Sequence, residues 1–276
     1  MTTNLTPVFT PNLMQKLLGR NYKWWYLINY SITRVRVGIL GDFINKIGFI
    51  TTTVLVIIVW QKSNPGIEII TYLLIGRTLR TLIDNFWYNR IGTLINTGGI
   101  SANLLQPNSF FWREFVASAG ERLIRNLLSF ISMILVLIGF IYFGTRIIFD
   151  FNIIFVLLLL PVGFFINYCL VFLVGICSFF IRDKRDFMSY TETYNALSTV
   201  FIGSIIPLNQ LPLKEFFQIL PFSYILHHPM QIYLGKYSPL EKLYVFLGGI
   251  AWCVVLYFLA KLVFRIGLKR NESVGL

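Results

Sequence analysis

Residues 202–236 read IGSIIPLNQLPLKEFFQILPFSYILHHPMQIYLGK, and the prolines of this stretch decide how the chain can cross a membrane. Proline removes a backbone donor and its ring clashes with the preceding helical turn, so one continuous spanning helix cannot form here. The stretch is nevertheless too apolar for an ordinary solvated loop. We therefore expect short interfacial or re-entrant helices. The prolines that divide the stretch are Pro207, Pro212, Pro221 and Pro229.

The composition excludes an ordinary soluble domain. Apolar residues make up 56% of the chain and charged residues 13%, and the mean hydropathy is positive. The formal net charge is +12, but the basic residues are dispersed between apolar runs instead of being gathered on one polar domain. This pattern argues against nucleic-acid binding and indicates membrane topology and contact with anionic lipid.

Six apolar runs are long enough to cross a hydrocarbon core of about 30 Å. They cover residues 44–60, 67–86, 126–144, 151–181, 189–207 and 240–264. The fourth run is too long for one straight span and contains Pro161, which predicts a kinked or tilted helix. We therefore predict an all-α polytopic membrane protein with six transmembrane helices, in a transmembrane domain of residues 44–266.

The segments that flank these runs have their own signatures. Residues 1–43 mix basic and aromatic residues, which suits a cytoplasmic tail followed by an amphipathic helix in the membrane plane. Residues 238–241 (SPLE) form a capping box with proline at the first helical position, so the last span begins there. The proline-containing stretch then becomes an extracytoplasmic segment of residues 207–237, and residues 267–276 form a cytoplasmic tail.

The distribution of basic residues predicts the orientation. An even number of spans places both termini on one side of the membrane. Basic residues crowd the region before the first span, the connection of residues 181–188 and the region after the last span, whereas the opposite side has few. The positive-inside rule then places both termini in the cytoplasm of a multi-pass protein of the cytoplasmic membrane. The few basic residues on the opposite side are Lys62, Arg146, Lys214 and Lys236.

Charged residues also occur inside the second span. Arg77, Arg80 and Asp84 are spaced by three and four residues, which places them on one helix face. A bare arginine near the midplane costs from about 3 to more than about 10 kcal/mol, so this face should point into protein or water. Asp84 is the partner of Arg80 in the helix, and Glu121 and Glu192 are candidate partners across the bundle. Substrate contact, a gating ion pair and a structural network that fixes helix register all fit this pattern.

Other kinds of site find little support. The sequence has no GxxxxGK[ST] phosphate loop, so this chain cannot hydrolyse ATP in the P-loop manner. Cys169, Cys177 and Cys253 lie in apolar runs without metal-ligand spacing. His227 and His228 are adjacent and point to different faces of a helix, which favours an outer-surface or pH-sensitive structural role. We predict no catalytic residue, no metal site and no cofactor in this chain.

Three separated segments have distinctive residue orders: the first two combine glycine, serine, leucine and proline, and the third combines arginine, glycine, leucine, a basic pair, glutamate, serine and glycine. The first is Gly98-Gly99-Ile100-Ser101-Ala102-Asn103-Leu104-Leu105-Gln106-Pro107. The second covers residues 203–235, and the third is FRIGLKRNESVGL at residues 264–276. Together with the layout of the spans, these segments resemble the type-2 ABC exporter permeases, the membrane subunits of ATP-driven efflux systems.

This resemblance implies partners for the chain. A separate ABC ATPase would bind ATP and Mg²⁺ and would dock on the segments of residues 87–113 and 181–188, and a second permease copy or a homologous permease would complete the transporter. The rival hypothesis is a self-sufficient channel or membrane-embedded enzyme that uses the charged face of the second span. The sequence does not identify the substrate. The residues expected to couple to the ATPase are Gly98, Gly99, Leu104, Leu105, Pro107, Arg182, Lys184 and Arg185.

Overall fold

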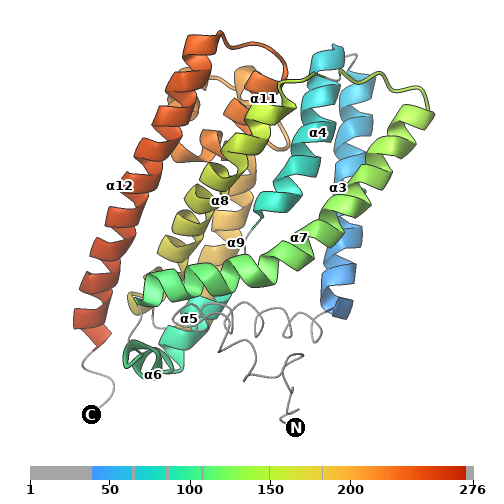
Figure 1. The fold of residues 1–276 in the computed structure, drawn as a ribbon. Coiled ribbons are helices and arrows are strands. Elements are labelled where there is room, and N and C mark those ends of the chain that lie inside the picture. The colour runs from blue at the N-terminus through green and yellow to red at the C-terminus, as the bar shows by residue number, and fades with distance from the viewer. Residues whose placement is uncertain are drawn as a thin grey trace, which may run out of the picture.

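The computed structural model describes residues 39–63, 66–84, 88–106, 109–148, 150–181 and 183–271, and these residues form helices and connecting loops with no strand among them. Figure 1 shows the arrangement. The predicted all-helical fold is confirmed for this part of the chain. The expected interfacial helix near the N-terminus lies outside the described residues.

Six longer helices overlap the six expected apolar runs one by one. Within the part of the chain that the structure describes, three of these helices are long and apolar enough to cross a membrane, namely α7, α12 and α8 with the 3₁₀ turn that follows it, so the chain is an integral membrane protein. The apolar part of α3 is shorter, and α4 and α9 fall outside that group, so the count of six spans stays a prediction. The helices are α3 (Ile39–Lys62), α4 (Ile67–Ile83), α7 (Phe110–Tyr142), α8 (Ile153–Ile176), α9 (Lys184–Phe201) and α12 (Pro239–Asn271).

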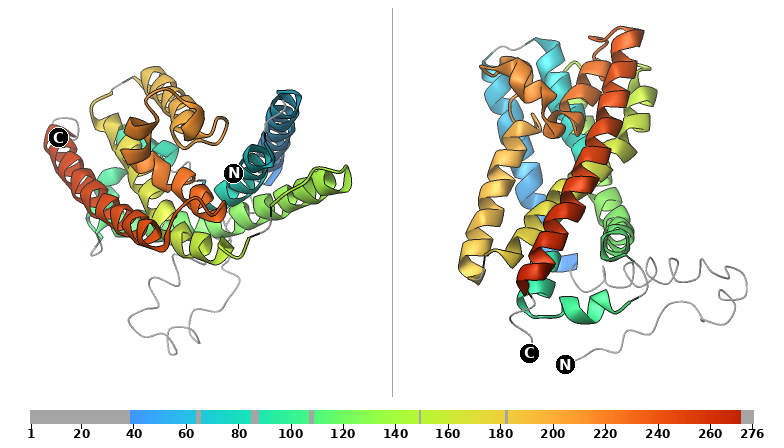
Figure 2. Two further views of the ribbon diagram at one scale, coloured as in Figure 1. Left: turned by 90° about the horizontal axis from the view of Figure 1, so that it is seen from above. Right: turned by 90° about the vertical axis from the view of Figure 1, so that its left-hand side faces the viewer.

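The bundle has two distinct ends. The lower end in Figure 1 holds α5 (Tyr88–Asn96) and α6 (Ile100–Leu104), and α3 begins and α12 ends at this end. The upper end holds the short helices between α9 and α12. Seen from above, α12 and α7 lie at the two ends of a curved row of helices with α8 between them (Figure 2).

The proline-containing segment breaks into short helices, as its sequence predicts. Pro221 is the first residue of its helix, where its missing N–H costs nothing. The helix α10 buries none of its side chains. The position of these pieces relative to a membrane stays a prediction. They are η4 (Leu208–Gln210), α10 (Lys214–Ile219), η5 (Pro221–Tyr224) and α11 (His227–Tyr233).

The helix α7 begins at Phe110, well before the apolar run of residues 126–144 that we expected to span the membrane. Its first half runs across the bundle near the lower end, and its second half rises toward the upper end (Figure 1). The first half is held by rings: Phe111 and Phe115 pack edge-on against Tyr168 of α8, with centroids 5.2 and 5.0 Å apart. The Tyr168 hydroxyl also donates to the Phe111 carbonyl at 2.9 Å. This half of α7 is therefore fixed to the core of the bundle.

The core is built around α8. This helix packs against α4, α5, α11 and α12, and Pro161 lies inside it without ending it. At the start of α12, the predicted capping box is confirmed, because the Ser238 N–H donates to the Glu241 carboxylate at 2.7 Å and the Glu241 N–H donates to the Ser238 hydroxyl at 3.4 Å. The helix then continues to Asn271, five residues past the expected end of the transmembrane domain at residue 266.

Candidate functional site

The lower half of α4 faces a cavity of about 320 Å³ that contains the charged face predicted from the sequence. Arg77, Arg80 and Asp84 all line it. The remaining walls come from α3, α8, α9 and the residues after α9, and within the described part of the chain none of these other lining residues is charged. They are Phe49, Thr52, Asn167, Val171, Tyr194, Asn195, Ser198, Thr199, Ile202 and Ile205. We call this space the lower cavity.

Arg80 is held on every side of its guanidinium. Its Nε lies 3.1 Å from Oδ1 of Asp84, one turn further along α4. Its Nη2 donates to the Thr199 hydroxyl at 3.3 Å, and its Nη1 donates to the Ser204 hydroxyl. The side chain is 9% exposed and that of Asp84 is 22% exposed. The Arg80–Asp84 pair therefore ties α4 to the upper end of α9.

Arg77 lies in the same cavity with a different environment. The residue is 3% exposed, and its guanidinium carbon lies 5.2 Å from the ring centroid of Phe49 on α3. Its Nε and Nη1 have no hydrogen-bond partner among the residues that the structure describes. A cation over an aromatic face gains some stabilisation, but the ring accepts no conventional hydrogen bond. Among the described residues, Arg77 is thus a buried cation whose Nε and Nη1 are unpaired.

The two glutamates expected to pair with this face lie elsewhere. Glu121 pairs with Arg125 one turn away on α7 at 3.3 Å, the i,i+4 order that favours a helical pair. Glu192 lies on α9 and is exposed. Neither residue is among the partners that the structure gives to Arg77 or Arg80. Within the described residues, Asp84 is the acid that meets the arginine face.

Two asparagines cap the end of α4, and the sequence analysis missed both. A helix leaves its last carbonyl groups without partners, which is costly in apolar surroundings. Asn126 of α7 donates to the carbonyl of Leu82 at 2.9 Å, and Asn167 of α8 donates to the carbonyl of Ile83 at 2.8 Å. Isolated asparagines within apolar runs were the signal that could have identified them. They allow α4 to end inside the bundle, beside Asp84.

The predicted ATPase-facing segments meet at the lower end. Gly98 has φ of +72°, a conformation that favours glycine, and it turns the chain from α5 into α6. Leu104 is 41% exposed and Leu105 is 89% exposed. A Cβ at Gly92 of α5 would clash with the ring of Phe187 on α9, so the two segments approach closely at this point. We call residues 88–106 the lower platform.

Other predicted coupling residues are placed less fully. Gly99 precedes the first residue of α6 and is partly buried. Arg185 is exposed, and its N–H donates to the Asp183 side chain, which caps α9, at 2.7 Å. Lys184 begins α9, whereas Pro107 and Arg182 lie outside the described residues.

A buried arginine attaches the platform to α7. Arg113 is 4% exposed and donates to the Asn103 carbonyl at 2.7 Å, to the Asn103 side chain at 2.9 Å and to the Gln106 side chain at 2.8 Å. Its neighbour Glu114 is also buried and pairs with Arg90 of α5 at 3.0 Å. Neither Arg113 nor Glu114 was predicted from the sequence to have a role. Their adjacent opposite charges at the start of an apolar helix were the available signal.

The two histidines lie at the upper end and contact different groups. His227 is fully buried, with its Nδ1 3.5 Å from the Tyr72 hydroxyl, and burial lowers its pKa to about 3. His228 lies 2.9 Å from the Tyr237 hydroxyl through Nδ1 and 2.9 Å from the Gln218 carbonyl through Nε2, and burial also lowers its pKa. Both rings are therefore neutral at physiological pH and connect the short helices to their neighbours.

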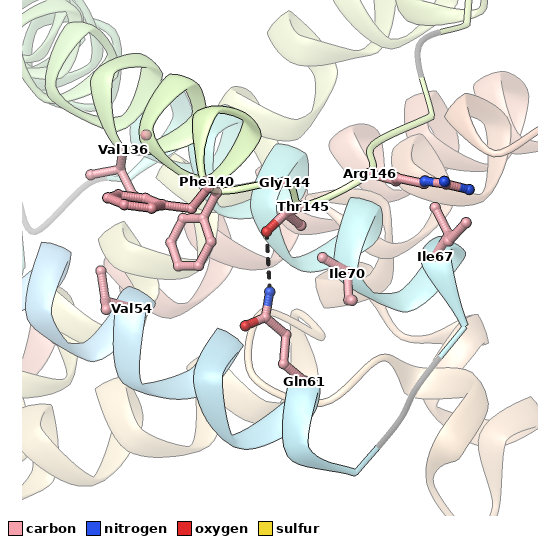
Figure 3. A pocket seen from close by; sticks show the side chains of 11 residues that line it. Val54, Gln61, Ile67, Ile70, Val136, Phe140, Gly144, Thr145 and Arg146 are labelled. Atoms are coloured by element: carbon pink, nitrogen blue, oxygen red, sulfur yellow. Dashed lines mark hydrogen bonds between the residues drawn. The ribbon is translucent and has the colours of Figure 1, made fainter.

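A second hollow lies near the upper end, between α3, α4 and α7, and Figure 3 shows it from close by. Its volume is about 770 Å³ and its walls are mostly apolar, with Val54 of α3 facing Val136 and Phe140 of α7. The Gln61 amide donates to the Thr145 hydroxyl at 3.2 Å across it. We call this space the upper groove.

A family model described as "ABC-2 family transporter protein" matches residues 67–275, which include α4, the lower platform and α12. This chain belongs to the ABC-2 transporter family. The resemblance to type-2 ABC permeases is thereby confirmed, and the chain is a membrane transport subunit. None of the curated proteins matches it.

Proposed function

We propose that this chain is the permease subunit of an ATP-driven exporter in the cytoplasmic membrane, and that a separate ABC ATPase drives it. The proposal goes beyond the family assignment in two respects, the direction of transport and the ATPase partner. The complete transporter contains two permeases, as two copies or as homologues, and ATP and Mg²⁺ bind to the ATPase chains. Both termini and the lower platform lie in the cytoplasm, and lipid surrounds the apolar helices.

The observation that carries the proposal is the build of the lower platform. It exposes Leu104 and Leu105 at the end of the bundle where α3 begins and α12 ends. It packs on α9 where Gly92 meets Phe187, and this close approach supports a docking surface shared by the two segments expected to contact the ATPase. Exposed leucines beside a rigid turn suit docking to a partner protein.

The platform also supplies a route from the ATPase to the lower cavity. Arg113 joins α6 to the start of α7, and Asn126 further along α7 holds the end of α4 beside Asp84. A displacement of α6 would therefore move α7 and, through it, the charged half of α4. ATP would act through different affinities for two arrangements of the permease, because a ligand that binds both equally shifts nothing.

The test uses two matched substitutions at opposite ends of the bundle. The full-length chain is purified from its native membrane in mild detergent, and the co-purified ABC ATPase is quantified by mass spectrometry. Leu105→Glu should reduce the recovered ATPase at least about tenfold, because a buried charge at an interface is strongly unfavourable. Leu213→Glu is the control, since Leu213 is 76% exposed and belongs to the upper end.

The control should retain the ATPase at the level of the unmodified chain. A chain that purifies as an active species without any ATPase would show that the exporter proposal is wrong and would favour a self-sufficient channel or enzyme. Equal loss of the ATPase in both variants would show that the lower platform is not its docking surface.

A further inference from the structure

Arg77 differs from every other charged group in the lower cavity. Arg80 pairs with Asp84 through Nε, and its two terminal nitrogens donate to Thr199 and Ser204. Arg77 is 3% exposed, yet its Nε and Nη1 have no hydrogen-bond partner in the described part of the chain. Buried guanidinium donors are normally paired, because an unpaired buried charge is strongly unfavourable. Within the described residues, Nε and Nη1 of Arg77 therefore lack an acceptor.

The net charge of the lower cavity also indicates that an anionic acceptor is missing. Among its lining residues Arg77 and Arg80 contribute +2 and Asp84 contributes −1, which leaves +1. That excess charge lies at Arg77, since Asp84 is engaged by Arg80. A guanidinium presents its donors in a planar fork that matches the oxygens of a phosphate or a carboxylate. An anionic group of this kind would supply both the missing acceptor and the missing charge.

The walls suit a small anionic group attached to a less polar body. Arg77 approaches the cavity from α4, the Phe49 ring covers it from α3, and Asn195 and Ser198 add polar atoms from α9. A volume of about 320 Å³ can admit such a group. Val171 and Ile202 supply apolar surface beside the polar groups. Nearby apolar surface favours an amphipathic anion over a fully hydrated one.

We propose that the lower cavity binds the phosphate or carboxylate group of an anionic molecule, with Arg77 as its principal donor. Because this inference rests on the proposed function, it assigns the transported substrate to the class of amphipathic anions. The same chemistry is offered by a soluble anion and by the headgroup of an anionic lipid. The experiment below separates these two sources.

The full-length chain is placed in nanodiscs of phosphatidylcholine, and its thermal unfolding midpoint is measured at constant ionic strength. One arm replaces chloride by inorganic phosphate, and the other replaces part of the phosphatidylcholine by phosphatidic acid. A ligand that binds only the folded state raises the midpoint, by about 3 °C at a concentration about tenfold above its Kd. We expect a saturable rise of this size in at least one arm. A rise with phosphate indicates a soluble anion, and a rise with phosphatidic acid alone indicates a lipid headgroup.

Three variants test whether the rise in the unfolding midpoint depends on Arg77. Arg77→Gln should abolish it, whereas Arg146→Gln, which removes an exposed arginine of the upper groove, should leave it unchanged. Thr52→Glu covers the case in which Arg77→Gln fails to fold. Thr52 is exposed and lines the same cavity from α3, so a carboxylate there should occupy the site and also abolish the rise.

The proposal is overturned if neither phosphate nor phosphatidic acid raises the midpoint of the unmodified chain. It is also overturned if the rise persists in Arg77→Gln or in Thr52→Glu. The measurement needs no ATPase, so its failure is distinct from loss of ATPase co-purification, which tests the proposed function itself.

Discussion

The upper and lower halves of the α3–α4 pair each border a hollow that contains an arginine, but the two arginines are handled in opposite ways. In the upper groove, Arg146 is exposed at the edge and the walls are apolar (Figure 3). In the lower cavity, Arg77 and Arg80 are buried among polar side chains. The smaller hollow therefore carries the charge, and the larger one carries the apolar surface.

Under the proposed function, this difference separates an anchoring half, which contacts lipid, from a working half, which binds the substrate. An exposed arginine keeps its water and needs no partner, so the upper groove can simply meet acyl chains of the surrounding lipid. A buried arginine needs acceptors, and the lower half of α4 meets this need with Asp84, Thr199 and Ser204 for one arginine only. An unpaired charge in a membrane segment is energetically costly. Proteins retain such a charge mainly where it serves a function. The substrate site proposed above therefore lies in the lower half.

The largest effect is expected from a test of the orientation of the two halves. In a chain whose native cysteines Cys169, Cys177 and Cys253 are replaced, single cysteines are introduced at Lys214 of the upper end and Lys184 of the lower end. Intact cells are treated with a membrane-impermeant thiol reagent. Labelling at position 214 and none at position 184 is expected, since Lys214 is exposed and the upper end is proposed to be extracytoplasmic.

The control for this labelling is the same reagent applied to permeabilised cells, in which both positions should react. Labelling of position 184 alone in intact cells would show that the orientation is the reverse of the one proposed. The lower platform would then face away from any cytoplasmic ATPase, and the assignment of the two halves would be reversed.

The next largest effect concerns the ion pair in the lower cavity. Asp84→Ala removes the acid that faces two buried arginines and should destabilise by about 3 kcal/mol, toward the lower end of the range for buried pairs because Asp84 is 22% exposed. Arg80→Ala should cost less, since the remaining carboxylate is partly hydrated. The double variant should cost less than the sum of the two single changes. Thermal unfolding of the purified chain measures all three.

Additive losses in this cycle would show that Arg80 and Asp84 each depend on some other group. Glu68→Ala with Lys236→Ala supplies a matched control at the upper end, where the pair is 2.7 Å apart but about half exposed on both sides. Exposed pairs contribute about 0 to 1 kcal/mol, so that cycle should be nearly flat.

The sequence predicted the positions of the helices well for a physical reason. Long apolar runs and prolines act locally, so the start of α12 and the breaks near Pro212 and Pro221 follow from adjacent residues. The extension of α7 from residue 126 back to Phe110 was missed. That continuity depends on rings of α8 packing against Phe111 and Phe115, and contacts between distant segments leave no periodic signal along the chain.

The site was predictable only in part for a similar reason. Spacing along one helix was enough to find Arg77, Arg80 and Asp84, because helical neighbours are fixed by geometry. It gave no information on which distant helix meets that face, so Glu121 and Glu192 were proposed while Thr199, Ser204 and Asn167 were overlooked. Neutral hydroxyl and amide groups occur throughout the sequence, and their partners emerge only when the chain is folded.

The smallest effects are expected from single neutral hydrogen bonds, and they sharpen the contrast between the halves. Asn167→Ala leaves the buried carbonyl of Ile83 without its donor at 2.8 Å, which should lower the unfolding free energy by about 1 to 3 kcal/mol. Gln61→Ala removes an exposed bond to Thr145 in the upper groove, where water can replace the lost partner, and should cost less than about 0.5 kcal/mol. Thermal unfolding in the same detergent compares them. A loss of similar size at Gln61 would mean that the upper groove is as tightly held as the lower cavity, and the division into an anchoring half and a working half would fail.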